Sequence, residues 1–92
     1  MKKIWAIEHH WADDDTVEYQ TTLYDSKEKA QASFNALVKS AKEDSWGGVI
    51  DEDGAVTDGY VLEETENSFD IFEEGFYIRN HEKIRLTQLD VN

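Results

Sequence analysis

Only one stretch of this chain has the periodicity of a helix, and this limits the fold class more than any other feature. Its apolar residues at helical spacing are Ala30, Phe34, Leu37, Val38 and Ala41, which form one stripe. Asp25 as N-cap followed by Glu28 is typical of a helix start, and Gly47 and Gly48 are typical of a helix end. We therefore predict a single amphipathic helix over Ser26–Lys42.

The rest of the chain alternates as strands do. Lys3–Trp11 and Thr16–Tyr24 flank the turn-forming Asp13–Asp15, which predicts an antiparallel hairpin. Later short runs are Val49–Ile50, Ala55–Val56, Tyr60–Leu62, Phe69–Phe72, Phe76–Ile78 and Ile84–Val91. We predict an α+β fold, with a single amphipathic helix packed on an antiparallel β-sheet built from an N-terminal hairpin and a C-terminal meander. A length of 92 residues predicts one domain, 1–92.

The charge is concentrated in the middle of the chain. The net charge is −12, and no Lys or Arg occurs between Lys42 and Arg79. That interval holds the carboxylates Glu43, Asp44, Asp51, Glu52, Asp53, Asp58, Glu63, Glu64, Glu66, Asp70, Glu73 and Glu74. Because one sign of charge attracts the other, this segment is expected to steer basic partners toward itself.

Composition excludes several classes of function. The chain has no cysteine, so disulfides, thiolate catalysis and cysteine-bound metals are excluded, and a reducing cytoplasmic location is expected. The pI of about 4.4 argues against direct binding of nucleic acid or of an anionic membrane. The apolar run at the N-terminus is broken by Glu8, which makes it too short for a signal peptide or a membrane span.

Metal binding and catalysis receive little support from the residue patterns. His9 and His10 are neighbours on a predicted strand, so they point to opposite faces and are not expected to share an ion with His81. The acidic turns do not fit a calcium-binding EF-hand loop. No nucleophile motif or phosphate-binding loop occurs. We expect no cofactor, no metal and no catalytic residue, and therefore no enzyme.

Two binding hypotheses from different classes remain. The first is a protein partner with a basic surface, held by Asp51, Glu52, Asp53, Asp58, Glu63, Glu64, Glu66, Asp70, Glu73 and Glu74. Asp51 with Asp53, and Glu64 with Glu66, are expected to form carboxylate rows along strands. The alternative is a small cytoplasmic domain that binds a small ligand or metal near Trp5, His10 and Trp11. A homodimer is left open under either hypothesis.

The chain also resembles known groups of proteins. The run Leu23-Tyr24-Asp25-Ser26-Lys27-Glu28-Lys29-Ala30 looks like the strand-to-helix junction of several small bacterial and phage families of unknown function. In size, acidity and layout, the chain resembles phage-encoded anti-CRISPR and anti-restriction proteins and nuclease-toxin immunity proteins. This resemblance implies an inhibitor that occupies the nucleic-acid-binding surface of a defence nuclease or a nuclease toxin.

Overall fold

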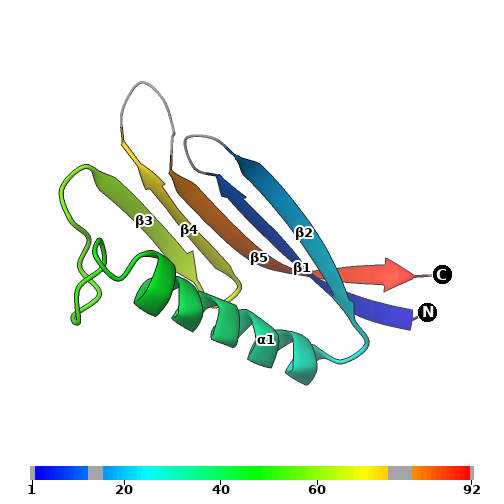
Figure 1. Cartoon of the computed structure of the whole chain (residues 1–92). Coiled ribbons are helices and arrows are strands. Elements are labelled where there is room, and N and C mark those ends of the chain that lie inside the picture. The colour runs from blue at the N-terminus through cyan, green and yellow to red at the C-terminus, as the bar shows by residue number, and fades with distance from the viewer. Residues whose placement is uncertain (1, 13–15, 75–79, 92) are drawn as a thin grey trace.

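The computed structural model describes residues 2–12, 16–74 and 80–91. Five strands form one antiparallel sheet in the order β2-β1-β5-β4-β3, and a helix lies against one face (Figure 1). The elements are β1 (Lys2–Ala12), β2 (Val17–Tyr24), α1 (Lys27–Ser40), the π-helix η1 (Ala41–Ser45), β3 (Tyr60–Thr65), β4 (Ser68–Glu73) and β5 (His81–Val91). The predicted α+β class, with one main helix on an antiparallel sheet, is confirmed.

The predicted N-terminal hairpin and C-terminal meander are both confirmed, since β1 pairs with β2 and β3, β4 and β5 pair in sequence. β1 pairs with β2, from Trp5 opposite Tyr24 at one end to Ala12 opposite Val17 at the other. β5 pairs with the other side of β1 and also with β4, so it becomes the central strand. The predicted turn at 13–15 and the predicted strand at 76–78 lie outside the described residues.

Strand alternation divides the side chains between two faces, which we call the helix face and the open face. Ile7 of β1, Ile84 of β5 and Phe69 of β4 lie on the helix face, because residues directly opposite in the register share a face. His10 and Lys83 belong to the open face by the same rule. The core lies between the helix face and α1.

The helix starts one residue later than predicted. Ser26 has the extended backbone that an N-cap needs, and its Oγ accepts a hydrogen bond from the Lys29 N–H at 3.4 Å. The predicted N-cap, Asp25, instead forms an exposed ion pair with Lys29 at 3.5 Å. The capping pattern therefore located the helix correctly but assigned the wrong capping side chain.

The helix ends in a π-turn that brings Trp46 into the core. The Trp46 N–H donates to the Ala41 carbonyl at 2.8 Å, five residues back. An α-helical continuation would place Ser45 on the buried stripe, four residues after Ala41. Because the π-turn holds one more residue, the buried position falls on Trp46 instead of Ser45, and Trp46 is 8% exposed.

Gly47 follows this turn for a steric reason. A Cβ at Gly47 would lie 2.5 Å from the Glu43 carbonyl oxygen. The sequence analysis attributed Gly47 and Gly48 to a helix end, where glycine usually adopts a positive φ, but positive φ angles among the described residues occur only at Gly54 and Gly59. The need for glycine at 47 therefore comes from close packing.

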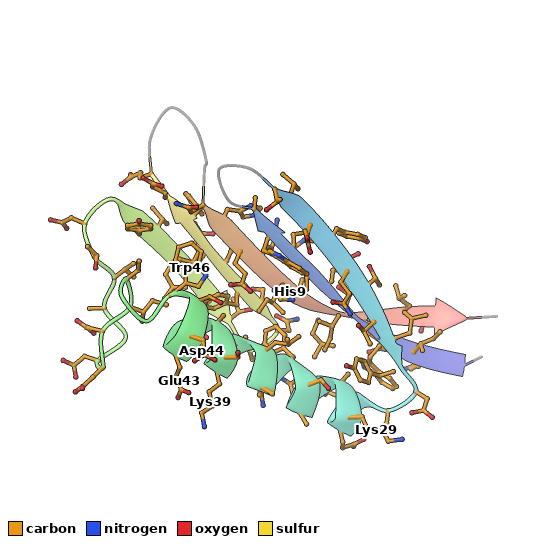
Figure 2. The ribbon with its side chains drawn as sticks, in the orientation of Figure 1. His9, Lys29, Lys39, Glu43, Asp44 and Trp46 are labelled. Atoms are coloured by element: carbon orange, nitrogen blue, oxygen red, sulfur yellow. The ribbon has the colours of Figure 1, made fainter. Side chains whose placement is uncertain are left out.

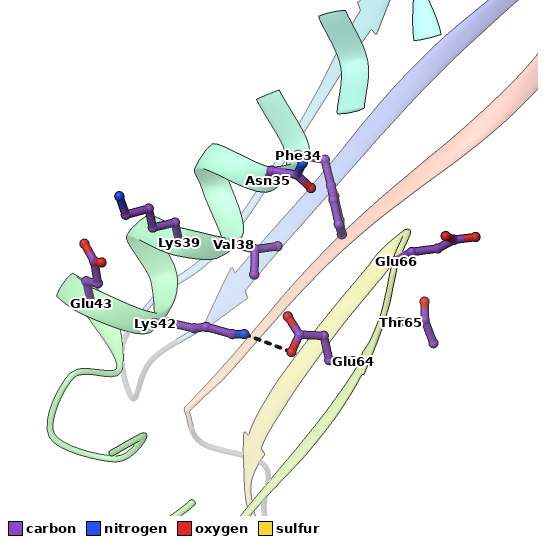
Figure 3. A pocket seen from close by; sticks show the side chains of 9 residues that line it. All are labelled: Phe34, Asn35, Val38, Lys39, Lys42, Glu43, Glu64, Thr65 and Glu66. Carbon is purple, nitrogen blue, oxygen red and sulfur yellow. Dashed lines mark hydrogen bonds and ion pairs between the residues drawn. The ribbon is translucent and has the colours of Figure 1, made fainter. Parts of the chain in front are cut away.

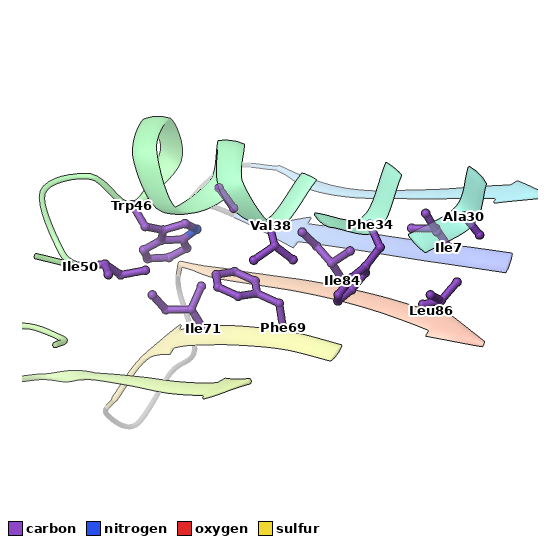
Figure 4. Close-up of a cluster of buried hydrophobic side chains, with 11 residues drawn as sticks. Ile7, Ala30, Phe34, Val38, Trp46, Ile50, Phe69, Ile71, Ile84 and Leu86 are labelled. Carbon is purple, nitrogen blue, oxygen red and sulfur yellow. The ribbon is translucent and has the colours of Figure 1, made fainter. Parts of the chain in front are cut away.

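The core runs along the underside of the helix and continues under Trp46 (Figure 4). Its largest fully buried side chains are Phe69, Ile7, Ile71 and Ile84. Ala30, Phe34 and Val38 supply the buried positions of α1. Trp46 and Ile50 extend this packing toward β4, so the segment after the helix is attached to the sheet by apolar contact.

Candidate functional site

We call the ten predicted partner-binding carboxylates the acidic margin: Asp51, Glu52, Asp53, Asp58, Glu63, Glu64, Glu66, Asp70, Glu73 and Glu74. All ten lie on β3, on β4 or in the segments directly adjoining these two strands. Eight are exposed, and Asp70 and Glu73 are half-buried. These carboxylates therefore gather at the β3 side of the sheet, although they lie on both of its faces and in the loop before it.

Four carboxylates of the acidic margin belong to the loop between η1 and β3. The short runs Val49–Ile50 and Ala55–Val56, predicted as strands, are reduced to a single bridge between Ile50 and Val56. Asp51 Oδ1 accepts hydrogen bonds from the backbone N–H groups of Asp53 and Ala55, each at 2.9 Å. The predicted strand row of Asp51 and Asp53 is wrong, because these residues form a turn in which Asp51 orders the backbone.

The carboxylates of β3 divide between the two faces. Glu63 lies on the open face, directly opposite Asp70, and Asp70 lies opposite Lys83 of β5. Glu64 lies on the helix face, opposite Phe69. Glu66 follows the strand in a turn, so the predicted strand row of Glu64 and Glu66 is also wrong.

Glu64 and Glu66 nevertheless line one groove between α1 and β3 (Figure 3). The groove has a volume of about 420 Å³, and Phe34 and Val38 contribute apolar lining. Lys42 Nζ crosses it to reach Glu64 Oε1 at 2.9 Å. Both side chains of this ion pair are 35% exposed, so the pair contributes little net stability but neutralises one charge of the margin.

A second cluster, on the helix face, centres on Glu82, which is the only buried charged side chain among the described residues. Trp46 Nε1 donates to Glu82 Oε1 at 2.8 Å. His9 Nε2 lies 2.5 Å from Glu82 Oε2, where its N–H donates to the carboxylate. Trp46 follows the helix and His9 comes from β1 (Figure 2), so the cluster joins three distant parts of the chain.

Glu82 and its two partners line a hollow of about 550 Å³ that opens to solvent. Trp11 and Tyr60 add aromatic walls. The Tyr60 ring meets the Trp46 ring edge-on at 6.1 Å between centroids, and the His9 and Trp11 centroids are 4.5 Å apart. The arrangement combines aromatic faces with a buried carboxylate, which suits an organic cation.

The hollow corrects the alternative ligand site of the sequence analysis. Trp11 does line it, but His10 lies on the open face, where its ring packs edge-on against Tyr19 at 4.4 Å. His9 takes the place assigned to His10, because alternate residues of β1 share a face. Trp5 packs against the hydrophobic core and does not line the hollow.

Sequence reasoning did not identify Glu82, although a signal was present. Glu82 alternates with Ile84 and Leu86, so it occupies an apolar face of β5. A carboxylate at such a position needs buried donors. The donors themselves, Trp46 and His9, were not predictable, because they reach Glu82 only through the sheet order and the π-turn.

Neither metal binding nor a shifted pKa identifies a reactive centre. In residues 2–12, 16–74 and 80–91, no group of three or more His, Cys, Asp or Glu side chains is placed to hold a metal ion. The pKa of Glu28 is lowered by a hydrogen bond with its own backbone and by the Ser26 hydroxyl. Glu28 lies in the first turn of α1 and is fully exposed, so its role is in the helix start.

Comparisons with known proteins add no functional assignment. No protein-family profile, curated protein or solved structure matches the chain. None of the helices in the described part of the chain has the length and apolar character needed to cross a bilayer.

Proposed function

We propose that the chain is a binding protein without catalysis, and that its acidic margin docks on a basic surface of a partner protein. The observation that carries this proposal is the position of the ten carboxylates at the β3 side of the sheet. Glu64 is the only one of them in an ion pair with Lys or Arg among the described residues. Seven of the other nine are exposed, although Asp51 is already committed to the backbone of its turn.

Electrostatics favours a partner built to bind nucleic acid. A groove that holds a phosphate backbone presents clustered Lys and Arg side chains, which attract anions from solution. When carboxylates of a second protein bind there, the counterions of both surfaces are released, and this release favours binding. The loop carboxylates and Glu63 are all exposed on this side of the sheet. The proposed partner class is a nuclease of host defence or a nuclease toxin.

The test compares two double variants with the same change in charge. Glu52→Lys with Glu63→Lys changes exposed residues of the acidic margin, and neither side chain makes a described hydrogen bond. Glu18→Lys with Asp90→Lys is the control, on exposed positions of β2 and β5. Affinity for candidate nucleases is measured by titration calorimetry at several salt concentrations.

The margin variant is expected to lose at least about tenfold in affinity and to show a weaker salt dependence, while the control stays near the native value. Candidate nucleases come from a pull-down on host lysate, washed at graded salt. If the margin variant binds as tightly as the native chain and the salt dependence is flat, the proposal is wrong.

A second candidate function is the binding of a small organic cation in the hollow over Glu82. Its support is the buried carboxylate in a hollow that the aromatic rings of Trp11, Trp46 and Tyr60 also line. The ligand class would be a guanidinium or ammonium compound, because cations bind well against aromatic faces next to a carboxylate.

Arginine amide and its neutral analogue citrulline amide test this function. A cation site predicts that only arginine amide raises the melting temperature, because a ligand of the native state stabilises it. Trp11→Leu removes one aromatic wall, including the ring that packs on His9, and keeps Glu82, His9 and Trp46 themselves. It should abolish the effect. Equal shifts with both amides would exclude a cation site.

A further inference from the structure

β2 is an edge strand without the usual protection against pairing. It lies at one end of the sheet order, and no described strand pairs with its outer side. Val17–Tyr24 contains no Lys, Arg or Pro, and its only carboxylate is Glu18. Its register with β1 runs through eight consecutive pairs without a bulge. Natural edges normally carry charges, prolines or bulges that prevent the addition of another strand.

The same strand exposes apolar side chains on the open face. Val17 is 83% exposed, and Tyr19 and Leu23 are each 59% exposed. Tyr19 is already held in place, because its ring packs on His10 and its hydroxyl accepts a hydrogen bond from Thr21 at 2.7 Å. An ordered aromatic side chain on a free edge loses little freedom when a partner strand arrives.

The charge distribution permits a second copy at this edge and disfavours it at the other. Pairing β3 with β3 of a second copy would bring Glu63 and Glu64 of both copies within a few strand spacings of each other. Pairing at β2 would place the two acidic margins at opposite ends of a ten-stranded sheet, about 43 Å apart at ordinary strand spacing. That distance is several times the Debye length of about 8 Å in physiological salt.

We infer that two copies of the chain associate by antiparallel pairing of β2 with β2, about a two-fold axis at Gln20. This register places Val17 of one copy opposite Leu23 of the other, and Tyr19 opposite Thr21. Residues directly opposite share a face, so the exposed apolar side chains of both copies meet on one continuous open face. A slip by one residue would place them against the polar side chains of the helix face.

One strand pair is a small interface, so the dimer is expected to be reversible, with a dissociation constant on the order of 100 µM. Sedimentation velocity of the full chain from about 5 µM to about 500 µM should show a monomer–dimer equilibrium. A chain that stays monomeric over this range would overturn the inference. A dimer that forms only when another protein is added would overturn it as well.

Two double variants test the register. Val17→Lys with Leu23→Lys puts like charges opposite each other twice and should weaken the dimer by at least about tenfold. Both changes make the chain less negative, so general repulsion cannot explain a loss. Val17→Lys with Leu23→Glu puts opposite charges in the same two pairs, and it should restore a dimer that weakens with salt.

The control changes the other edge. Glu63→Lys with Glu66→Lys should leave the dimer intact or strengthen it slightly through reduced repulsion. Far-ultraviolet circular dichroism checks that each variant is folded, and the substituted side chains are all exposed. The inference is overturned if the like-charge double variant of Val17 and Leu23 leaves the dimer unaffected, or if the opposite-charge double variant fails to restore it.

Discussion

Among the strands that the structure describes, β2 and β3 each lie at an edge with one side of the backbone unpaired, yet they differ in charge and in attachment. β3 carries Glu63 and Glu64, and its first residues pack against the segment that contains Trp46 and Ile50. β2 carries one carboxylate, Glu18, and its open-face side chains are largely exposed. The difference shows how one small sheet can repel its own copy at one edge and accept it at the other.

The largest change in the free energy of unfolding is expected at Trp46, which packs the segment before β3 into the core. Trp46→Ala removes a buried ring and one donor to Glu82, so it should lower the free energy of unfolding by about 3–5 kcal/mol. Val17→Ala, on the β2 edge, should change it by no more than about 0.5 kcal/mol. Urea unfolding at low protein concentration measures both. Similar decreases in the free energy of unfolding for the two variants would show that both edges of the sheet are packed equally well.

The next effect concerns the turn that leads from the helix to the β3 side. Gly47→Ala forces a Cβ against the Glu43 carbonyl and should cost about 1–3 kcal/mol. Gly48→Ala is the matched control, because no atom lies within 4 Å of its added Cβ. It should be neutral or stabilise by up to about 1 kcal/mol. Thermal unfolding of both variants makes the comparison, and equal melting temperatures would contradict the steric account.

A smaller effect is expected from repulsion within the acidic margin. Glu63 faces Asp70, and like charges directly opposite destabilise by about 0.2–1 kcal/mol. Raising the salt from about 10 mM to about 150 mM should therefore raise the melting temperature. Glu63→Lys should raise it at low salt and flatten the dependence, whereas Glu18→Lys on β2 should do so less. A melting temperature that falls with added salt would contradict the repulsion.

The smallest effect belongs to the β2 side, at the start of α1. The pKa of Glu28 is lowered in the folded chain, so the ionised side chain favours folding above the ordinary Glu value. This contribution should disappear as the pH falls through the lowered pKa. Glu28→Gln should be slightly less stable than the native chain at pH 6, and the difference should shrink as the pH falls below the ordinary Glu pKa. Urea midpoints across this range test the sign, and a difference that grew on acidification would contradict it.

Local patterns were sufficient where neighbours in the sequence decide the outcome. The apolar stripe from Ala30 to Ala41 located α1, and the alternation of Lys3–Trp11 assigned His9 and His10 to opposite faces correctly. The segment between Lys42 and Arg79 was correctly identified as the source of the charge. Its geometry was only partly predictable, since Asp51 forms a turn and Glu63 and Glu64 point to opposite faces.

The sequence by itself determined the main helix, the N-terminal hairpin with the two faces of its strands, and the sign of the charge, because each depends on residues a few positions apart. Tertiary structure alone decided that β5 lies at the centre, that Trp46 turns inward through a π-turn, and that Glu82 meets His9. It also decided which strands are edges. These outcomes depend on packing between segments far apart in the chain, and periodicity carries no information about such pairs.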